Sequence, residues 1–204
     1  MALAMGAAME TVRERLRAVL DRAARPVAWA LHWCHITPNQ VSLMGILLTL
    51  VTAALIVDGQ LLLAGLMYIL AASLDLLDGV LARMAKMASR FGAFLDSTAD
   101  RISEGVVFAA IAYHFANHGQ SVDAALAVLA LLGSLLVSYT RARAEGLGLE
   151  CKVGIVTRAE RVLLIALGLM LGQLPVAIYL LVALTAFSAM QRILHTFRQL
   201  YPQG

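Results

Sequence analysis

Four aspartates stand at helical spacing inside a strongly apolar part of the chain. Asp75 and Asp78 are three residues apart and Asp96 and Asp100 are four apart, so each pair shares one face of a helix. Carboxylates inside apolar segments are rare and energetically costly, which makes them candidates for a functional site. The residue types and their spacing therefore indicate carboxylate chemistry close to a membrane.

The two pairs also lie at matched depths. The segments that carry them are joined by a short turn near Met87, and we expect them to be antiparallel neighbours. Asp78 and Asp96 are equally far from that turn, while Asp75 and Asp100 are about one helical turn further from it. Four carboxylates in one small volume need a compensating cation, and an all-oxygen site suits Mg²⁺ or Mn²⁺ rather than zinc. Because magnesium usually bridges carboxylates to phosphates, we predict a phosphorylated substrate.

Structural ion pairs are the alternative for these acids, for instance Asp100 with Arg101. Four acids at matched depth favour the functional site, and the residues beside them are small: Gly79, Ala82 and Gly92. Glu104 continues the helical stripe of Asp96 and Asp100 but has no matched partner on the preceding apolar segment. We therefore expect Glu104 to be a buried polar support rather than a member of the metal site.

The composition is that of an integral membrane protein. Of the 204 residues, 61% are hydrophobic and 14% are charged, whereas soluble domains have about 45–50% apolar and about 25% charged residues. This excludes a disordered, collagen-like or disulfide-stapled secreted protein. The two cysteines are far apart and the net charge is only +3, so the sequence indicates neither a zinc site nor a nucleic-acid partner.

Six apolar segments are candidates to cross a hydrocarbon core of about 30 Å. We predict an all-α integral membrane protein whose catalytic domain, residues 38–204, is one bundle of six transmembrane helices. The fifth segment is short and is expected to extend back to Arg158 or further. The predicted spans are residues 41–57, 61–81, 91–115, 124–139, 162–171 and 174–193.

Residues 1–37 differ from the rest of the chain. A helical stripe of apolar residues runs from Val12 to Val27, and arginines flank it. This pattern predicts a basic amphipathic helix that lies in the headgroup plane of the lipid bilayer, with Trp29 and Trp33 in the interfacial aromatic belt. A solvated helix packed on the bundle is the alternative.

The cations indicate the orientation of the bundle. All 16 lysines and arginines fall on one side of the predicted topology, and the loops on the other side, residues 58–60, 116–123 and 172–175, contain none. By the positive-inside rule, both termini and the acidic site face the cytoplasm. We therefore expect a multi-pass protein of the cell membrane (plasma or inner).

The acidic segment resembles the signature of the CDP-alcohol phosphotransferase family. The run Asp75-x2-Asp78-Gly79-x2-Ala82-Arg83-x8-Gly92-x3-Asp96-x3-Asp100 matches every fixed residue and both spacers of that signature. A Pro-Asn pair near the first span, Pro38 and Asn39, is a further similarity. The resemblance extends over most of the chain, because that family also has an N-terminal surface helix and six spans.

This resemblance implies transfer of a phosphatidyl group from a CDP-linked lipid to an alcohol, with release of CMP. It implies that Asp75, Asp78 and Asp96 bind divalent metal, with two ions expected. It implies that Asp100 is the general base on the acceptor hydroxyl and also touches the second metal. Gly79 and Ala82 would make room for the cytidine and Arg83 would meet its phosphates. The implied CDP-lipid site is Asn39, Asp75, Asp78, Gly79, Ala82, Arg83 and Gly92.

A second cation cluster bears on the acceptor. It consists of arginines around the ends of the fourth, fifth and sixth spans: Arg141, Arg143, Arg158, Arg161 and Arg192. Guanidinium groups suit bidentate phosphate recognition, so we predict a soluble alcohol phosphate as acceptor. Residues 138–145 and 158–161 resemble the phosphatidylinositol phosphate synthases of bacteria and archaea, which implies inositol 1-phosphate. Glycerol 3-phosphate is the second candidate, since residues 147–156 contain only one cation, Lys152. Any of these arginines could instead be a membrane anchor.

An ion-coupled transporter is the alternative from another class, because intramembrane acids also mark ion pathways. Transporters place such acids near the midplane and contain internal repeats, whereas these acids lie near one surface and no repeat is evident. The small residues Gly133, Ser134 and Gly168 are typical of helix packing in membranes or of a dimer face. We expect a homodimer.

Overall fold

The computed structural model describes residues 2–85 and 89–201, with side chains from residue 18 onward. Within these ranges the chain forms seven helices and no strand, which confirms the predicted all-α fold class. The helices are α1 (Ala2–Trp33), α2 (Pro38–Val57), α3 (Leu61–Met84), α4 (Arg90–Asn117), α5 (Ser121–Gly146), α6 (Arg158–Met170) and α7 (Leu174–Leu200). As expected, α6 extends back to Arg158.

Four of the described helices are long and apolar enough to cross a membrane. They are α2, α3, α5 and α7, with mean hydropathies between 1.8 and 2.2. The other two helices of the bundle are α4 and α6. The helix α4 has 28 residues but is less apolar, since it carries Asp96 and Asp100 of the signature, and α6 is short, with 13 residues. Leucines such as Leu43, Leu47 and Leu50 are exposed along α2, as a surface that faces lipid requires. The chain is a helical membrane protein.

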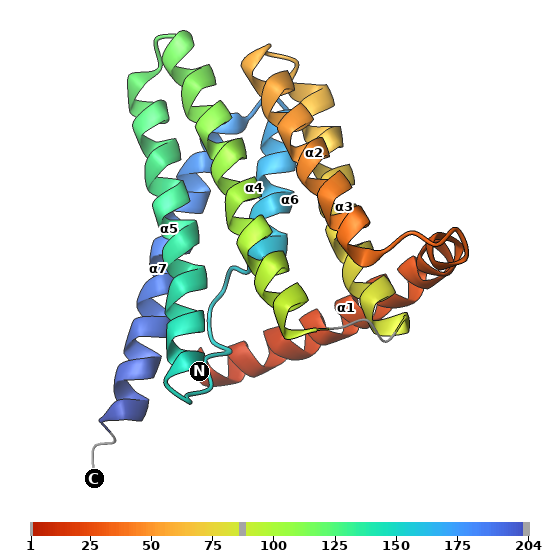
Figure 1. Ribbon diagram of the computed structural model, residues 1–204. Coiled ribbons are helices and arrows are strands. Elements are labelled where there is room, and N and C mark those ends of the chain that lie inside the picture. The colour runs from red at the N-terminus through yellow and green to blue at the C-terminus, as the bar shows by residue number, and fades with distance from the viewer. Residues whose placement is uncertain (1, 86–88, 202–204) are drawn as a thin grey trace.

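Six helices surround a common core (Figure 1). They contact one another in a closed ring, α2 to α3, α6, α7, α5, α4 and back to α2. Phe108, Ile111, Ile165 and Leu181 are among the fully buried side chains in the centre. The helices α5 and α7 approach each other closely at Gly133 of α5. A Cβ at this position would lie 2.2 Å from the hydroxyl oxygen of Thr185 on α7.

The ring confirms only part of the expectation that α3 and α4 are antiparallel neighbours: their acids meet, but the two helices do not pack on each other. The helices α3 and α4 are consecutive, but they share no extended contact; α3 packs on α2 and α6, and α4 packs on α2 and α5. The facing sides of α3 and α4 carry carboxylates, which cannot bury one another as apolar side chains do. The facing carboxylates of the two helices therefore form a group that could hold a cation.

Local signals set the helix ends on the side of the acids. Thr37 begins α2 with a capping box, in which its N–H donates to Gln40 Oε1 at 2.8 Å. Ser89 caps α4 by accepting a hydrogen bond from the N–H of Gly92 at 2.9 Å. Glu160 accepts the N–H of Thr157 at 2.8 Å and so fixes the first turn of α6. The cap of α6 fixes the turn that carries Arg158, Glu160 and Arg161, whereas the first turns of α2 and α4 contain no acid.

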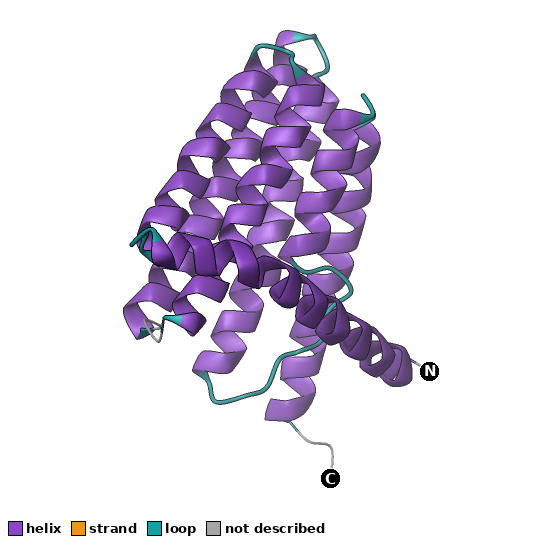
Figure 2. Cartoon of the chain, turned by 90° about the vertical axis from the view of Figure 1, so that its right-hand side faces the viewer, coloured by secondary structure: helices purple, strands orange, loops and turns teal. Residues whose placement is uncertain are grey.

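The N-terminal helix α1 runs across the bundle rather than along it (Figures 1 and 2). Ala24 and Ala28 are buried against Val80 and Leu81 of α3, so small side chains bring α1 close to the signature helix. The helix is 32 residues long, so it extends beyond the predicted amphipathic stretch at both ends, and it continues through Pro26. Its location in the headgroup plane stays a prediction.

Candidate active site

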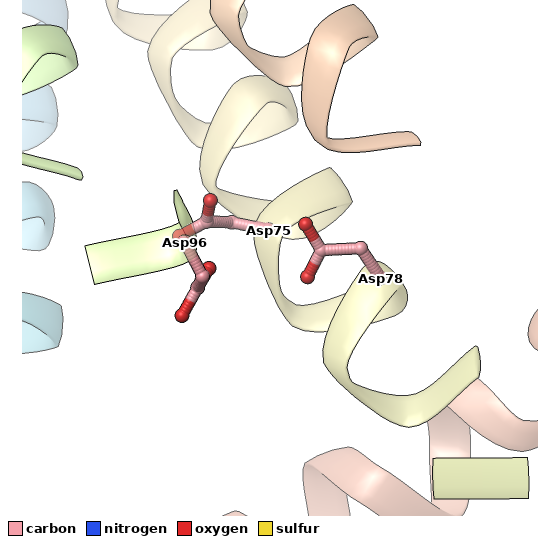
Figure 3. Close-up of side chains that lie close together, drawn as sticks. All are labelled: Asp75, Asp78 and Asp96. Carbon is pink, nitrogen blue, oxygen red and sulfur yellow. The ribbon is translucent and has the colours of Figure 1, made fainter. Parts of the chain in front are cut away.

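Three of the four aspartates meet between α3 and α4 (Figure 3). One carboxylate oxygen from each of Asp75, Asp78 and Asp96 lies within 4.8 Å of the other two. Asp78 is buried, Asp75 is half-buried and Asp96 is exposed, so the cluster opens toward solvent on the α4 side. Oxygen ligands at this separation have the geometry to hold a hard divalent cation such as Mg²⁺ or Mn²⁺.

Asp100 lies beside this cluster rather than within it. Its Oδ1 lies 2.9 Å from Nη1 of Arg158, and the same nitrogen donates a hydrogen bond to Oδ2 of Asp75. Arg101 is a weaker neighbour, with Nη1 3.9 Å from Oδ2 of Asp100. Arg158 of α6 thus joins the carboxylates of α3 and α4 and stands between the cluster and the neighbouring cavity.

One residue of α2 that was not predicted from the sequence supports the carboxylate cluster. The hydroxyl of Ser42 donates a hydrogen bond to Oδ2 of Asp78, the most buried member. Ser42 stands one helical turn after Asn39, whose own side chain is exposed at the start of α2. A hydroxyl residue one turn inside a mainly apolar span was the available signal. Burial of Asp78 is tolerated because a hydroxyl satisfies one of its oxygens.

The remaining residues of the signature lie on the cytoplasmic ends predicted for α3 and α4. Gly79, Ala82 and Gly92 are partly exposed, and the backbone N–H of Gly92 is engaged by the cap of α4. A Cβ on Gly79 would lie 3.5 Å from Nη1 of Arg83, so the guanidinium covers the face that glycine leaves open. Arg83 pairs with Asp21 of α1, with Nη2 3.0 Å from Oδ2.

A cavity of about 880 Å³ adjoins the cluster and is lined by α4, α5, α6 and α7. Four of the five arginines of the second cluster line it, from three different helices: Arg141, Arg158, Arg161 and Arg192. Arg143 is exposed and is not among the lining residues. Two further charged residues, Arg101 and Glu145, also line it, and hydroxyl groups complete the polar lining, from Ser97, Thr98, Ser138, Tyr139 and Thr157. The cavity therefore suits a polar anion of the size of a sugar phosphate.

Arg161 forms a buried ion pair at the base of this cavity. Its Nε donates to Oε1 of Glu104 at 2.8 Å and its Nη2 donates to Oε2 at 3.1 Å. Arg161 is 1% exposed and Glu104 is 4% exposed. Glu104 is a buried polar support, as its position in the stripe predicts, and its partner comes from α6 rather than from the preceding span.

Arg192 fastens the connection between α5 and α6. Its Nε donates to the carbonyl of Val153 at 2.9 Å, and its Nη1 donates to the carbonyl of Val137. Gly154 has a φ of 130°, which other residues rarely adopt, and a Cβ there would lie 3.0 Å from Arg192 Nε. The loop therefore approaches Arg192 closely.

Comparison with known proteins defines the class to which this site belongs. Residues 35–193 match the CDP-alcohol phosphatidyltransferase family. The match covers the whole signature and most of the bundle, so the chain belongs to that family and is a transferase enzyme.

The names of individual relatives specify a product in addition to the family. The chain is 34% identical over 197 residues to an archaetidylinositol phosphate synthase of Methanothermobacter thermautotrophicus, covering 94% of this chain and 97% of that one. It is 40% identical over 152 residues to a phosphatidylinositol phosphate synthase of Cutibacterium acnes, covering 74% and 73%.

Solved structures of the Mycobacterium tuberculosis phosphatidylinositol phosphate synthase share the fold. One of them, with CDP-DAG bound, has a TM-score of 0.79 and 31% identity, and the match covers 87% of this chain and 94% of that one. A structure of the same protein in complex with manganese and citrate has the same TM-score and identity, covering 85% and 88%.

Proposed function

We propose that this protein transfers a phosphatidyl group from CDP-diacylglycerol, or from the corresponding archaeal CDP-lipid, to inositol 1-phosphate. The products are phosphatidylinositol phosphate and CMP. The observation that carries this proposal is the contact, through Arg158, between the carboxylate cluster and an arginine-lined cavity. Bacterial and archaeal relatives named for inositol phosphate products support the same acceptor.

The carboxylate cluster would hold the metal and the pyrophosphate of the CDP-lipid. Asp75, Asp78 and Asp96 would be the ligands of Mg²⁺ or Mn²⁺, with Asp100 at a second ion. A divalent ion bound there neutralises phosphate charge and stabilises the departing CMP. Ser42 would keep Asp78 oriented through its hydrogen bond.

The cytidine end of the lipid would lie along the open face of α3. Gly79 and Ala82 would give it space, Arg83 would meet its phosphates, and Asn39 and Gly92 would border it. Partial exposure of Gly79, Ala82 and Gly92 supports this assignment, and the nearest side chain to the open face of Gly79 is the Arg83 guanidinium that would meet the phosphates. A nucleotide could therefore approach the backbone closely at these positions.

Asp100 would be the general base. The oxygen of the acceptor hydroxyl forms a bond to the lipid-bearing phosphorus, the bond from that phosphorus to the bridging oxygen breaks, and CMP leaves with the bonding electrons. Asp100 accepts the hydroxyl proton. Its contact with Arg158, which lines the cavity, supports this role, because a base must lie within hydrogen-bond reach of the acceptor.

The arginines of the cavity would bind the phosphate of the acceptor. Arg158 is the nearest to the carboxylates, and Arg141 and Arg192 would face it across the cavity. Arg161 uses two of its five N–H donors on Glu104 and would contribute charge from below. Arg143, which is exposed, would act at the entrance. A phosphate on the acceptor would supply an anionic partner for the guanidinium donors that the ion pairs of Arg141, Arg158 and Arg161 do not use.

The arrangement in the membrane is also part of the proposal. The ring of six helices would span the bilayer of the cell membrane as six transmembrane segments, with both termini and the active site on the cytoplasmic side. Residues 1–37 would form the surface helix that precedes this domain. The soluble acceptor would then enter from the cytoplasm and the CDP-lipid from the bilayer, and two copies would form a homodimer.

A CMP-release assay tests this function. The purified protein is incubated with CDP-diacylglycerol and Mg²⁺ or Mn²⁺, and inositol 1-phosphate, glycerol 3-phosphate, serine and inositol are offered separately. We expect metal-dependent CMP release with inositol 1-phosphate and little with the unphosphorylated alcohols. A preference for glycerol 3-phosphate would contradict the acceptor, and no release with any alcohol together with ion flux in liposomes would favour a transporter.

A further inference from the structure

The contact between Arg83 and Asp21 joins the surface helix to the signature helix. Nη2 of Arg83 lies 3.0 Å from Oδ2 of Asp21, and the hydrogen bond spans 62 residues of sequence. The side chain of Asp21 is 27% exposed and that of Arg83 is 48% exposed. The acid is therefore the better fixed of the two partners, and it holds a long side chain that would otherwise be free in solvent.

Asp21 faces the bundle because of its helical position. It precedes Ala24 by three residues and Ala28 by seven, so all three lie on the face of α1 that packs on α3. Among the described side chains of α1, from residue 18 to 33, Asp21 is the only acid. A single carboxylate on the inner face of a basic helix has a specific partner rather than a general solubility role.

The guanidinium of Arg83 is held over the CDP-lipid side of α3. Nη1 lies 3.5 Å from the position that a Cβ on Gly79 would take, and Gly79 follows Asp78 of the carboxylate cluster directly. Asp21 engages only Nη2, so other N–H donors of Arg83 are left on the side of Gly79. An arginine whose guanidinium is held by a carboxylate on one side presents its remaining N–H groups to a phosphate in one orientation.

We propose that Asp21 is a positioning residue for CDP-lipid binding, which acts by holding Arg83 against the Gly79 face of the site. This inference rests on the proposed function, in which Arg83 meets the phosphates of the CDP-lipid. It makes α1 part of the substrate site: the helix that lies across the bundle sets the direction of a phosphate-binding side chain on α3. Loss of the carboxylate weakens substrate binding because Arg83 then samples many rotamers before it meets its ligand.

The test compares Asp21→Asn with Arg83→Ala in the CMP-release assay. Arg83→Ala is expected to raise the KM for the CDP-lipid about tenfold, because a charge-assisted contact to phosphate is lost. Asp21→Asn is expected to raise the same KM about threefold, the range of a half-exposed ion pair, with kcat and the acceptor KM unchanged. Asp21→Glu, which keeps the charge, is expected to recover most of the binding.

Two controls separate positioning from stability. Asp58→Asn makes the same chemical change at an exposed residue at the end of α2, and should leave every constant unchanged. Thermal unfolding of each variant in detergent reports folding independently of turnover. In the Arg83→Ala background, Asp21→Asn should have no further effect on the KM for the CDP-lipid, since it acts only through Arg83.

The outcomes distinguish this inference from the proposed function. An unchanged or lower CDP-lipid KM in Asp21→Asn, while Arg83→Ala raises it, would overturn the role of Asp21 and leave that of Arg83 intact. An unchanged KM in Arg83→Ala would overturn both assignments. A lower unfolding temperature in Asp21→Asn without a change in KM would show that the ion pair only stabilises the packing of α1.

Discussion

The carboxylate cluster and the arginine-lined cavity are built in different ways. The acids come from two consecutive helices and lie within one short stretch of sequence, so helical spacing alone predicts which of them share a face. The arginines come from α5, α6 and α7, and what each does depends on a partner far away in sequence. The chemistry common to the family is thus encoded locally, whereas recognition of the acceptor depends on how distant helices pack.

The largest effect should follow from removing a ligand of the carboxylate cluster. We expect Asp75→Asn to lower kcat/KM by at least about 10³-fold and to weaken both metal and CDP-lipid binding, because one oxygen ligand and the partner of Arg158 are lost together. Titration with Mn²⁺ followed by electron paramagnetic resonance measures the metal affinity directly. Metal affinity equal to that of the parent would contradict the assignment of Asp75 as a ligand.

Asp100→Asn should separate catalysis from binding. We expect kcat to fall about 10²–10⁴-fold, the usual contribution of a general base, while the KM for the CDP-lipid changes little. The asymmetry arises because Asp100 lies beside the group formed by Asp75, Asp78 and Asp96, which would bind the first ion without it. Steady-state kinetics with both substrates varied is the measurement, and turnover equal to that of the parent would remove Asp100 as the base.

Loss of the buried ion pair between Arg161 and Glu104 should lower the folding stability of the protein around the cavity. Glu104→Gln leaves Arg161 as a buried charge without its carboxylate, which costs about 3–5 kcal/mol of stability. We expect a clear drop in the unfolding temperature in detergent, together with weaker acceptor binding. Glu150→Gln is the matched control, since the side chain of Glu150 is 83% exposed and pairs only with Lys152. An equal unfolding temperature in the two variants would contradict the importance of the buried pair.

Arg192→Ala should have the smallest effect on turnover and should change the KM of the acceptor rather than that of the CDP-lipid. We expect the acceptor KM to rise about tenfold while the KM for the CDP-lipid stays constant, because the variant loses a cavity charge and the anchor of Val153. Arg198→Ala removes an exposed cation from the end of the same helix and serves as control. A rise in the KM for the CDP-lipid instead would contradict the assignment of the CDP-lipid to the carboxylate cluster and of the acceptor to the arginine-lined cavity.

Part of the site could be read from local patterns and part could not. The period of the helix predicted the face shared by Asp75 and Asp78, and it also predicted that Glu104 would be a buried support. It did not predict that Glu104 pairs with Arg161, because 57 residues separate them. Ser42 was missed for the same reason, since its importance depends on the packing of α2 against Asp78.

The amino-acid sequence by itself determined the class of the protein. Apolar segments long enough to span a bilayer and a signature of fixed spacing are local properties, and neither requires knowledge of which helices touch. The tertiary structure decided that α3 and α4 do not pack on each other, that Asp21 of α1 holds Arg83, and that five arginines line one cavity. The physical reason is that packing is decided by the surfaces that distant segments present to each other, and a carboxylate face has no apolar partner to bury.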